Sequence, residues 1–428
     1  MSDRILICTV GGSHQPIVTS IRELEPGFVC FLCTDRDPGT GQPGSRIQVE
    51  GKGNVIKVRP GDPDPTLPNI PAQTDLAADR YEVRTLPADD LDAAFSVIAG
   101  AIVELRKRFP NTRLIADYTG GTKTMTAALV MAALETPDVE LRLVTGARAN
   151  LVQVHDGTQL GVPAVVEGVR LRRAIAPYLS AWTYFGYGAA AAGLAQIPVP
   201  HDPALRAELQ IARDLSAAFD AWDRFDHRAA LARLDLYRPK IGSRAGLMLK
   251  FLEMLCLGDD DQRKEPARLL DLWLNAQRRA VQGRYDDAVA RAYRLLEWTA
   301  QWLLRTRAGI DTSDVPSDKV PEGMALRPSR EGRLQAGLYE AWRLAAFHLE
   351  GVPRDFARTE DKRLLDHLKA RNASILAHGY LPIDAETWRR FHGWMEQAFI
   401  PMLRQAAGEA GVRMEPPQLP IAPIWESG

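Results

Sequence analysis

An arginine and a histidine stand seven positions apart in residues 370–380, which read ARNASILAHGY. Seven residues make two turns of an α-helix, so a continuous helix would bring Arg371 and His378 to within about 20° of each other on one face. Leu368 and Ile375 project in nearly the same direction, which places the pair at the edge of an apolar stripe. A cation is seldom buried alone, so we expect either an acidic partner for Arg371 or a face that opens onto a polar cleft or a subunit interface.

These two side chains, with Asn372 beside them, have the chemistry to move protons and to stabilise charge on phosphate. His378 has an intrinsic pKa near neutrality and can act as a general acid or base. Arg371 can hold two phosphate oxygens at once and stabilise a transition state, while Asn372 orients either group or the phosphate. The alternative is that Arg371 pairs with a buried acid and His378 caps the helix before Gly379, and the helix taken alone favours this alternative.

Two glycine pairs, Gly11-Gly12 and Gly120-Gly121, each follow a predicted strand and precede a predicted helix. Loops at the carboxyl ends of strands are the places where open α/β sheets bind ligands. Glycine lets the backbone approach a ligand closely, and the helix that follows offers free N–H groups and the positive end of its dipole. Either loop can also be a simple tight turn.

The second glycine loop, DYTGGTKT, has further groups that suit phosphate. It adds the hydroxyls of Thr119 and Thr122 and the ammonium group of Lys123. It is not a Walker A motif, because no glycine precedes the lysine and the spacing differs. Asp117, at the end of the preceding strand, is predicted either to line the site or to cap the loop.

The first glycine loop continues into Ser13, His14 and Gln15, which complete the predicted ligand-binding set. His14 and Gln15 have the groups to read a base or a ribose, and His14 is equally suited to an ordinary helix start. No histidine in the chain shows metal-ligand spacing with cysteine or acidic residues, so we expect no metal.

Strands and helices alternate over the first 175 residues, which predicts a doubly wound parallel sheet. The predicted strands are RILICTV, GFVCFLCT, YEVRTL and TRLIAD, with VELRLVTG and NLVQVHDG as a closing hairpin. Helices are expected at about 89–109 and 123–135, and residues 36–75, rich in Pro and Gly, are expected to form a surface excursion. A linker is predicted at about 193–203, and the chain beyond it is predicted to be helical.

The predicted fold class is therefore α/β followed by all-α, in three parts. Residues 1–175 form a Rossmann-like ligand-sensing domain, 176–260 a helical connecting region and 261–428 a helical domain. Helices are expected at 204–236, 244–257, 262–282, 285–307, 334–350, 360–379 and 384–407. Asp286 and Asp287 are expected at a helix start and not as metal ligands.

Composition excludes several classes of protein. The 428 residues carry a net charge of −1, so any nucleic-acid site must be local. The chain does not begin with a signal-peptide layout, and no apolar run is long enough to span a membrane, so we expect a cytoplasmic protein without a membrane partner. Cys30 and Cys33 lie in one predicted strand, where residues three apart point to opposite faces, so we expect buried thiols and no redox pair.

Taken together, the glycine loops and the helical half resemble a known family. The first part, through ICTVGGSHQPIVTSI and DYTGGTKTMTAALVMAAL, is similar to CRISPR-associated Rossmann-fold (CARF) domains. The helical part resembles a HEPN ribonuclease domain, whose signature is an Arg, usually followed by Asn, then four to six residues and a His. Here the signature is Arg371, Asn372 and His378. The order CARF then HEPN resembles the ancillary ribonucleases of type III CRISPR systems.

This resemblance implies a function and the residues that perform it. It implies that cyclic oligoadenylate, with tetra-adenylate favoured over hexa-adenylate, is an allosteric activator held by both glycine loops and Asp117. It implies a homodimer in which paired HEPN domains cleave single-stranded RNA in antiviral defence, with Arg371, Asn372 and His378 as catalytic residues. RNA carries its own nucleophile, the 2′-hydroxyl, so neither a metal nor a cofactor is required. With CARF-like loops in the same chain, this interpretation is favoured over the helix-cap alternative.

Two other classes of protein fit parts of the sequence. A non-catalytic sensor whose helical part binds a protein or nucleic-acid partner would have no need of the Arg371 and His378 pair, and the chain lacks a basic recognition helix. A dinucleotide-dependent enzyme is expected to carry G-x-G-x-x-G and an acid about 20 residues further on, and neither is found.

Overall fold

The computed structural model describes residues 3–39, 41, 43–51, 54–57, 66–146, 148–149, 153–154, 159–372, 375 and 379–425. The chain divides into two compact units, Met1–Arg170 and Leu171–Gly428. The boundary falls inside helix α6 (Glu167–Ser180) and not at 193–203. That expected linker lies within the second unit, where it joins α7 (Tyr187–Ala195) to α8 (Pro203–Asp223).

A six-stranded sheet in the order β10-β7-β6-β1-β2-β5 forms the centre of the first unit. Its strands are β1 (Arg4–Thr9), β2 (Phe28–Cys33), β5 (Tyr81–Thr85), β6 (Arg113–Asp117), β7 (Val139–Thr145) and β10 (Leu160–Pro163). All neighbours pair parallel except β7 and β10, which confirms the predicted doubly wound sheet. The predicted hairpin is wrong in its partner, because β7 pairs with β10 while β9 (Gln153–Val154) pairs with β8 (Arg148–Ala149).

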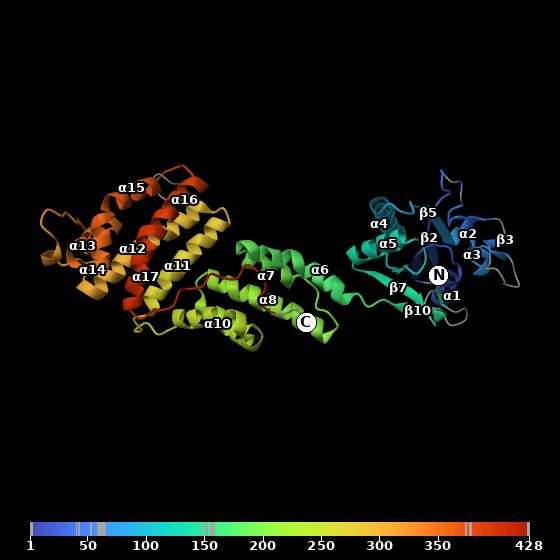
Figure 1. Cartoon of the computed structure of the whole chain (residues 1–428), viewed down its shortest axis with the longest axis horizontal. Helices are drawn as coiled ribbons and strands as arrows, with labels where there is room; N and C mark the ends of the chain where they lie inside the picture. The colour runs from blue at the N-terminus through green and yellow to red at the C-terminus, as the bar shows by residue number, and fades with distance from the viewer. Residues whose placement is uncertain are drawn as a thin grey trace. The chain divides into compact units, whose positions relative to one another are not determined.

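Helices cover both faces of this sheet (Figure 1). On one face lie α4 (Leu91–Arg108) and α5 (Lys123–Glu135), and on the other α1 (Gln15–Leu24), α2 (Ile47–Glu50) and α3 (Ile70–Gln73). The last two belong to the Pro- and Gly-rich segment, which therefore contributes to the core of the unit.

The two cysteines of β2 show the strand alternation directly. Cys30 packs in the core on the α4–α5 side and Cys33 in the core on the α1 side, as predicted. Both are fully buried, and burial raises the pKa of Cys33 to about 12. Both thiols therefore remain protonated and behave as small apolar groups.

The second unit is helical around one continuous core. After α8, its α-helices are α9 (His227–Leu236), α10 (Arg238–Leu255), α11 (Lys264–Val281), α12 (Tyr285–Ala308), α13 (Leu338–His348), α14 (Gly351–Thr359), α15 (Asp361–Asn372), α16 (Ala385–Trp394) and α17 (Ile400–Glu409). The single helix expected over 204–236 is interrupted because Phe225 takes a left-handed conformation (φ 64°) and Asp226 caps a new helix. Among the described helices, none has the length and apolar character needed to cross a bilayer.

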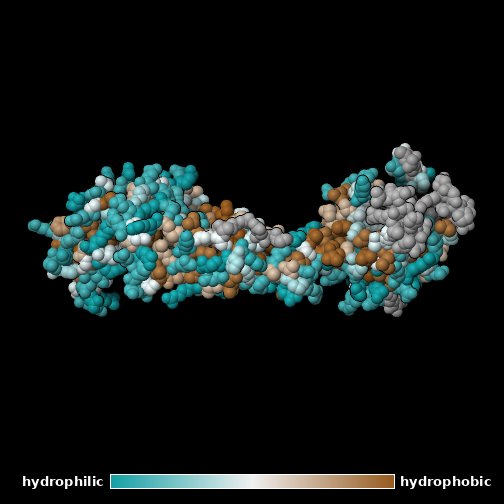
Figure 2. All heavy atoms as spheres, turned by 60° about the horizontal axis from the view of Figure 1, so that its bottom comes forward, coloured by the Kyte–Doolittle hydropathy of each residue, from teal (hydrophilic) through white to brown (hydrophobic). Residues whose placement is uncertain are grey.

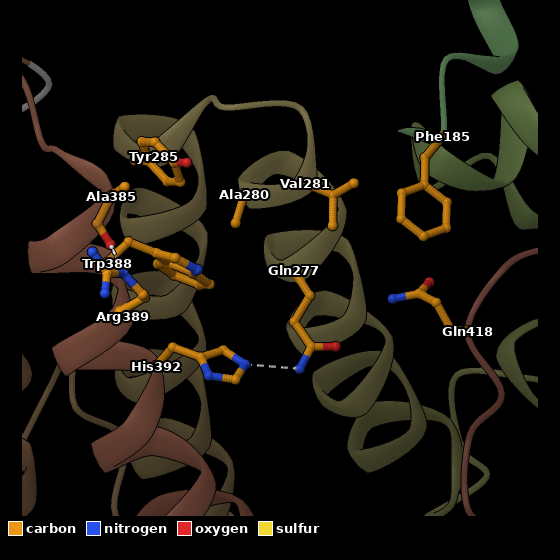
Figure 3. A pocket seen from close by; sticks show the side chains of 10 residues that line it. All are labelled: Phe185, Gln277, Ala280, Val281, Tyr285, Ala385, Trp388, Arg389, His392 and Gln418. Atoms are coloured by element: carbon orange, nitrogen blue, oxygen red, sulfur yellow. Dashed lines mark hydrogen bonds between the residues drawn. The ribbon is translucent and has the colours of Figure 1, made fainter. Parts of the chain in front are cut away.

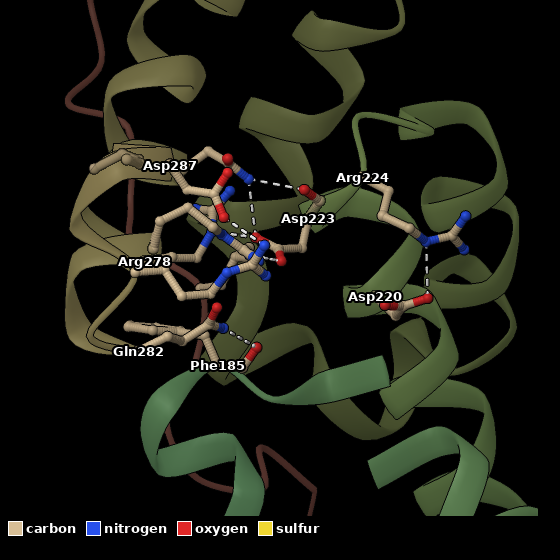
Figure 4. Close-up of polar contacts among 12 residues, drawn as sticks. Phe185, Asp220, Asp223, Arg224, Arg278, Gln282 and Asp287 are labelled. Atoms are coloured by element: carbon tan, nitrogen blue, oxygen red, sulfur yellow. Dashed lines mark hydrogen bonds and ion pairs between the residues drawn. The ribbon is translucent and has the colours of Figure 1, made fainter. Parts of the chain in front are cut away.

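A buried charge network joins distant parts of the second unit (Figure 4). Asp223, at the end of α8, accepts hydrogen bonds from Arg278 Nε (2.7 Å), from Asn275 Nδ2 (2.9 Å) and from Arg279. Arg278 is fully buried and also donates to Gln418 Oε1 (2.7 Å), in the segment that follows α17. The network therefore holds α8, α11 and this later segment together.

The segment that follows α17 returns to the early helices of the unit. The hydroxyl of Tyr187 donates to the carbonyl of Pro420 (2.7 Å), and the ring of Trp425 packs edge-on against that of Trp182, 5.7 Å between centroids. Leu419, Ile424 and Trp425 of this segment are thus part of the core of the second unit.

Candidate functional site

The two glycine loops meet at the point where the strand order of the first unit reverses. Strands β1 and β6 are adjacent, with Cys8 opposite Asp117, and the chain moves away from them in opposite directions, to β2 and to β7. The loops after β1 and β6 therefore border the crevice in which open α/β sheets bind ligands. The structure thus brings the two predicted loops together.

Contact between these loops leaves no room for side chains. The hydroxyl of Thr9 donates to the carbonyl of Gly120 (2.6 Å). A Cβ on Gly11 would lie 2.5 Å from the amide nitrogen of Gly121, and a Cβ on Gly120 would lie 2.4 Å from the carbonyl oxygen of Thr9. Gly121 also has a positive φ of 89°. Gly11, Gly120 and Gly121 are required by this close approach of two backbones.

Hydrogen bonds of Asp117 and Thr119 fix the start of the second loop. The buried carboxylate of Asp117 accepts hydrogen bonds from the amide (2.9 Å) and hydroxyl (2.5 Å) of Thr119 and from the hydroxyl of Ser20. The hydroxyl of Thr119 in turn accepts from the amide of Val144 (2.7 Å). Burial raises the pKa of Asp117, although these hydrogen bonds oppose the shift. The geometry matches the loop-capping alternative for Asp117.

The N-terminus of α5 presents a cation and free helix amides. Thr122 caps the helix, because its hydroxyl accepts from the amide of Met125 (3.2 Å) and donates to the carbonyl of Ala88 (2.6 Å). Lys123 is the first helical residue and is exposed. The amides of the first turn and the helix dipole add partial positive charge beside its ammonium group. This arrangement favours an anionic ligand such as phosphate.

The first loop exposes Gly12 and Ser13 but not the histidine that follows them. His14 is buried at the start of α1, and its carbonyl accepts the amides of Ile17 and Val18. Gln15 is half-buried, and its side-chain oxygen accepts from the hydroxyl of Ser13 (2.9 Å). His14 therefore has the placement of a helix-start residue.

Gln48 is a member of this site that sequence reasoning missed. Its side-chain amide, on the short helix α2, donates to the carbonyl of Gly11 (2.6 Å) and so fixes the first loop. It is buried, and its Oε1 has no hydrogen-bond partner among the described residues. Nothing in the pattern of residues 36–75 marks it, since the contact depends on how that segment folds back over the sheet.

The structure describes part of the second predicted site. Arg371 and Asn372 form the end of α15, and their side chains and all of His378 lie outside the described residues. The amide of Ile375 donates to the carbonyl of Leu381 (3.1 Å), whereas a continuous helix would direct it back to the carbonyl of residue 371. The helix expected over 360–379 is therefore too long. Without a continuous helix, helical spacing no longer predicts that Arg371 and His378 share one face.

The chain after His378 is fixed by two aspartates. The carboxylate of Asp286, in the first turn of α12, accepts the amide of Ile383 at 3.1 and 3.2 Å. Asp384 caps α16 by accepting the amide of Thr387 (2.8 Å). Asp286 and Asp287 stand at a helix start, as predicted, and Asp286 has the further task of holding this segment. Across the described ranges, no three His, Cys, Asp or Glu side chains gather as metal ligands would.

Comparison with known proteins finds relatives of both units. Residues 259–400, which include Arg371, Asn372 and His378, match the family model described as the Csm6 HEPN domain. The fold is similar to that of Enterococcus italicus Csm6 bound to cyclic hexa-2′-fluoro-hexa-dAMP, with a TM-score of 0.58 and 14% sequence identity over 97% of this chain and 96% of that chain. No curated protein matched the chain.

The family match locates a HEPN domain within the helical unit, and the likeness of fold extends over nearly the whole chain. Both agree with the resemblance drawn from the two glycine loops and the Arg-Asn…His signature. The helical unit therefore contains a Csm6-type HEPN domain at residues 259–400, and the fold of the whole chain is similar to that of Csm6.

Proposed function

We propose that this chain is an endoribonuclease that cyclic oligoadenylate activates and that cleaves single-stranded RNA as a homodimer, without a metal ion. The observation that carries the proposal is a combination within one chain. A phosphate-suited site lies at the switch point of a CARF-like sheet, and residues 259–400 match the HEPN domain of Csm6 and contain the Arg371, Asn372 and His378 set.

The proposed reaction uses the nucleophile that RNA supplies. The 2′-oxygen attacks the neighbouring phosphorus and the bond from phosphorus to the 5′-oxygen breaks, which leaves a 2′,3′-cyclic phosphate and a 5′-hydroxyl. His378 takes the proton from the 2′-hydroxyl or delivers one to the leaving oxygen. Arg371 stabilises the charge that grows on the phosphate, and Asn372 orients it. Two copies of each residue would allow one acid and one base.

The proposed activator site is the crevice between the two loops. The phosphates of the activator would contact Lys123, the first amides of α5 and the exposed backbone of Gly12 and Ser13. The sequence-based prediction is a cyclic tetra-adenylate. The structurally similar Csm6 was solved with a cyclic ligand of six nucleotides. Calorimetric titration with the cyclic tri-, tetra- and hexa-adenylates decides the ring size.

Exposed apolar residues in both units support a homodimer. The outer face of α5 carries Ala127 and Met131 where a solvated helix would carry charge, and the first unit shows apolar surface in Figure 2. In the second unit, Tyr380 is 92% exposed and Leu381 71% exposed, directly after His378. A two-fold axis through both surfaces would bring two copies of each site together, with a ring-shaped activator across the axis.

Incubation of the protein with unstructured RNA in EDTA, with and without each cyclic oligoadenylate, tests the proposal. We expect cleavage that depends on the activator, and a loss on the order of a hundredfold or more in His378→Ala, the usual weight of a general acid–base group. Unchanged cleavage by His378→Ala would remove that residue from the reaction. Activator binding without cleavage of RNA would favour the non-catalytic sensor.

A further inference from the structure

A cavity of about 470 Å³ opens beside α16 in the second unit (Figure 3). Three helices form most of its wall, and the turn before α7 and the segment after α17 close one side. It is lined by Phe185, Gln277, Ala280, Val281, Tyr285, Ala385, Trp388, Arg389, His392 and Gln418. The space is large enough for a purine ring, and its wall is mainly apolar with a few polar groups, as in small-ligand sites.

Helical spacing brings these side chains together. On α16, Ala385, Trp388 and His392 recur at the interval that puts residues on one helical face. On α11, Gln277 and Val281 stand one turn apart. The cavity is thus built on rigid helices.

The indole N–H of Trp388 is a hydrogen-bond donor that the protein leaves unused. Trp388 is only 6% exposed, yet within the described residues nothing accepts a hydrogen bond from its Nε1, which points into the cavity in Figure 3. The neighbouring Trp273 and Trp394 donate to Glu396 and Glu360, both at 2.7–2.8 Å. Because this N–H opens onto the cavity and is not among the fully buried polar atoms, a ligand bound there can accept its hydrogen bond.

Gln277 offers the complementary acceptor. Its Nε2 donates to Glu396 Oε1 (3.0 Å) and lies 3.3 Å from Nε2 of His392, so the orientation of the amide is fixed. The ring of His392 is held in turn by stacking on Trp273, with centroids 5.3 Å apart. The Oε1 of Gln277 points away from His392, toward the Gln418 side of the cavity (Figure 3).

We propose that this cavity binds one base of the RNA substrate, a base whose Watson–Crick edge carries an amino group next to a ring-nitrogen acceptor, namely adenine or cytosine. This inference rests on the proposed function. The amino group would donate to Gln277 Oε1, the ring nitrogen would accept from Trp388 Nε1, and the apolar walls would pack against the ring. Uracil and guanine carry a carbonyl oxygen in place of that amino group, which would face the oxygen of Gln277.

The cavity adjoins the chain that follows His378, from residue 383 to the start of α16. Ala385 in its wall begins the helix that follows that segment, and Tyr285 precedes Asp286, the residue that holds the amide of Ile383. Arg389 at the wall can meet a backbone phosphate of the same RNA. A base held here would place the neighbouring nucleotides along the catalytic segment.

The test measures binding of short A-, C-, G- and U-oligoribonucleotides to the His378→Ala protein by fluorescence anisotropy, with activator present. In this protein we expect A or C oligomers to bind most tightly. Val281→Phe, at a position 57% exposed, should fill the cavity and weaken their binding by about 5- to 150-fold, the range for loss of one stacked base. Trp388→Phe, which keeps a ring but lacks the N–H, should reduce the preference for A or C. Leu247→Phe, 64% exposed on α10, is the matched control and should bind as the parent does.

Equal affinity for all four oligomers, or full affinity in Val281→Phe, would overturn the inference. AMP or CMP that binds as tightly as the oligomer would identify a free nucleotide, not RNA, as the ligand, and would overturn it as well. Binding is measured without cleavage. Failure of the wild-type protein to cut RNA would therefore count against the proposed function and not against base binding.

Discussion

A single methyl group on Gly11 should separate the two loops of the CARF-like site. The Cβ of Gly11→Ala would lie 2.5 Å from the amide nitrogen and 3.0 Å from the Cα of Gly121. That is roughly 1 Å short of ordinary van der Waals contact, and both neighbouring atoms are backbone, so one loop must move by that amount. Overpacking of this kind costs about 1–3 kcal/mol. Gly12→Ala is the matched control, because its Cβ would meet nothing within 4 Å.

The assay is calorimetric titration of both variants with the cyclic oligoadenylates, together with thermal unfolding. We expect Gly11→Ala to lower the unfolding temperature of the first unit by about 2–12 °C, the shift that corresponds to 1–3 kcal/mol in a domain of this size. We also expect it to weaken activator binding at least tenfold, since a displaced loop no longer presents its backbone to the same phosphate. Gly12→Ala should leave the unfolding temperature unchanged, because its Cβ would meet no neighbouring atom. Activator affinity in Gly11→Ala equal to that of the parent protein would refute the view that contact between the loops shapes the site.

Four further predictions concern the rest of the chain. Lys123→Ala should weaken activator binding without changing basal RNA affinity, as calorimetry and anisotropy can show. Asp286→Ala should release the amide of residue 383. A displacement of the catalytic residues by about 1 Å would lower the cleavage rate about 10- to 100-fold. Asp287→Ala serves as the control. Burial lowers the pKa of His367, so as the pH falls the unfolded chain takes up a proton that the folded chain does not. The free energy of unfolding should therefore fall as the pH drops below about 6.5. Thermal unfolding at pH 5 and pH 7 should show a smaller pH dependence in His367→Phe. Arg278→Met should destabilise the second unit by about 3–5 kcal/mol in denaturant unfolding, because Asp223 would lose a buried partner.

Local chemistry allowed much of the first unit to be predicted from the sequence. Helix α5 has the expected bounds, since Thr122 provides an N-cap and no glycine or proline interrupts the helix. The glycine pairs were assigned to one ligand site because parallel strands end at the same edge of a sheet. Gln48 escaped prediction because its contact with Gly11 depends on the path of an irregular segment.

The second unit was harder to predict, and for a physical reason. Apolar spacing through Ile375 imitates a helix, but the periodic pattern carries no information about the bond from its amide to the carbonyl of Leu381. The cavity beside α16 likewise unites residues more than 200 positions apart, from Phe185 to Gln418. Such contacts arise from tertiary packing, which a reading of local sequence does not contain.

The return of residues 418–425 to the early helices has a consequence for synthesis on the ribosome. Domains fold as units, the N-terminal one first, and the sheet of the first unit has cores of its own. In the second unit, Arg278 lacks its hydrogen bond to Gln418, and Trp182 its contact with Trp425, until those two later residues have been made. A nascent or prematurely terminated chain would therefore carry a folded first unit without a finished second unit. If the proposed function holds, such chains would take up activator without exposing the cell's RNA to cleavage.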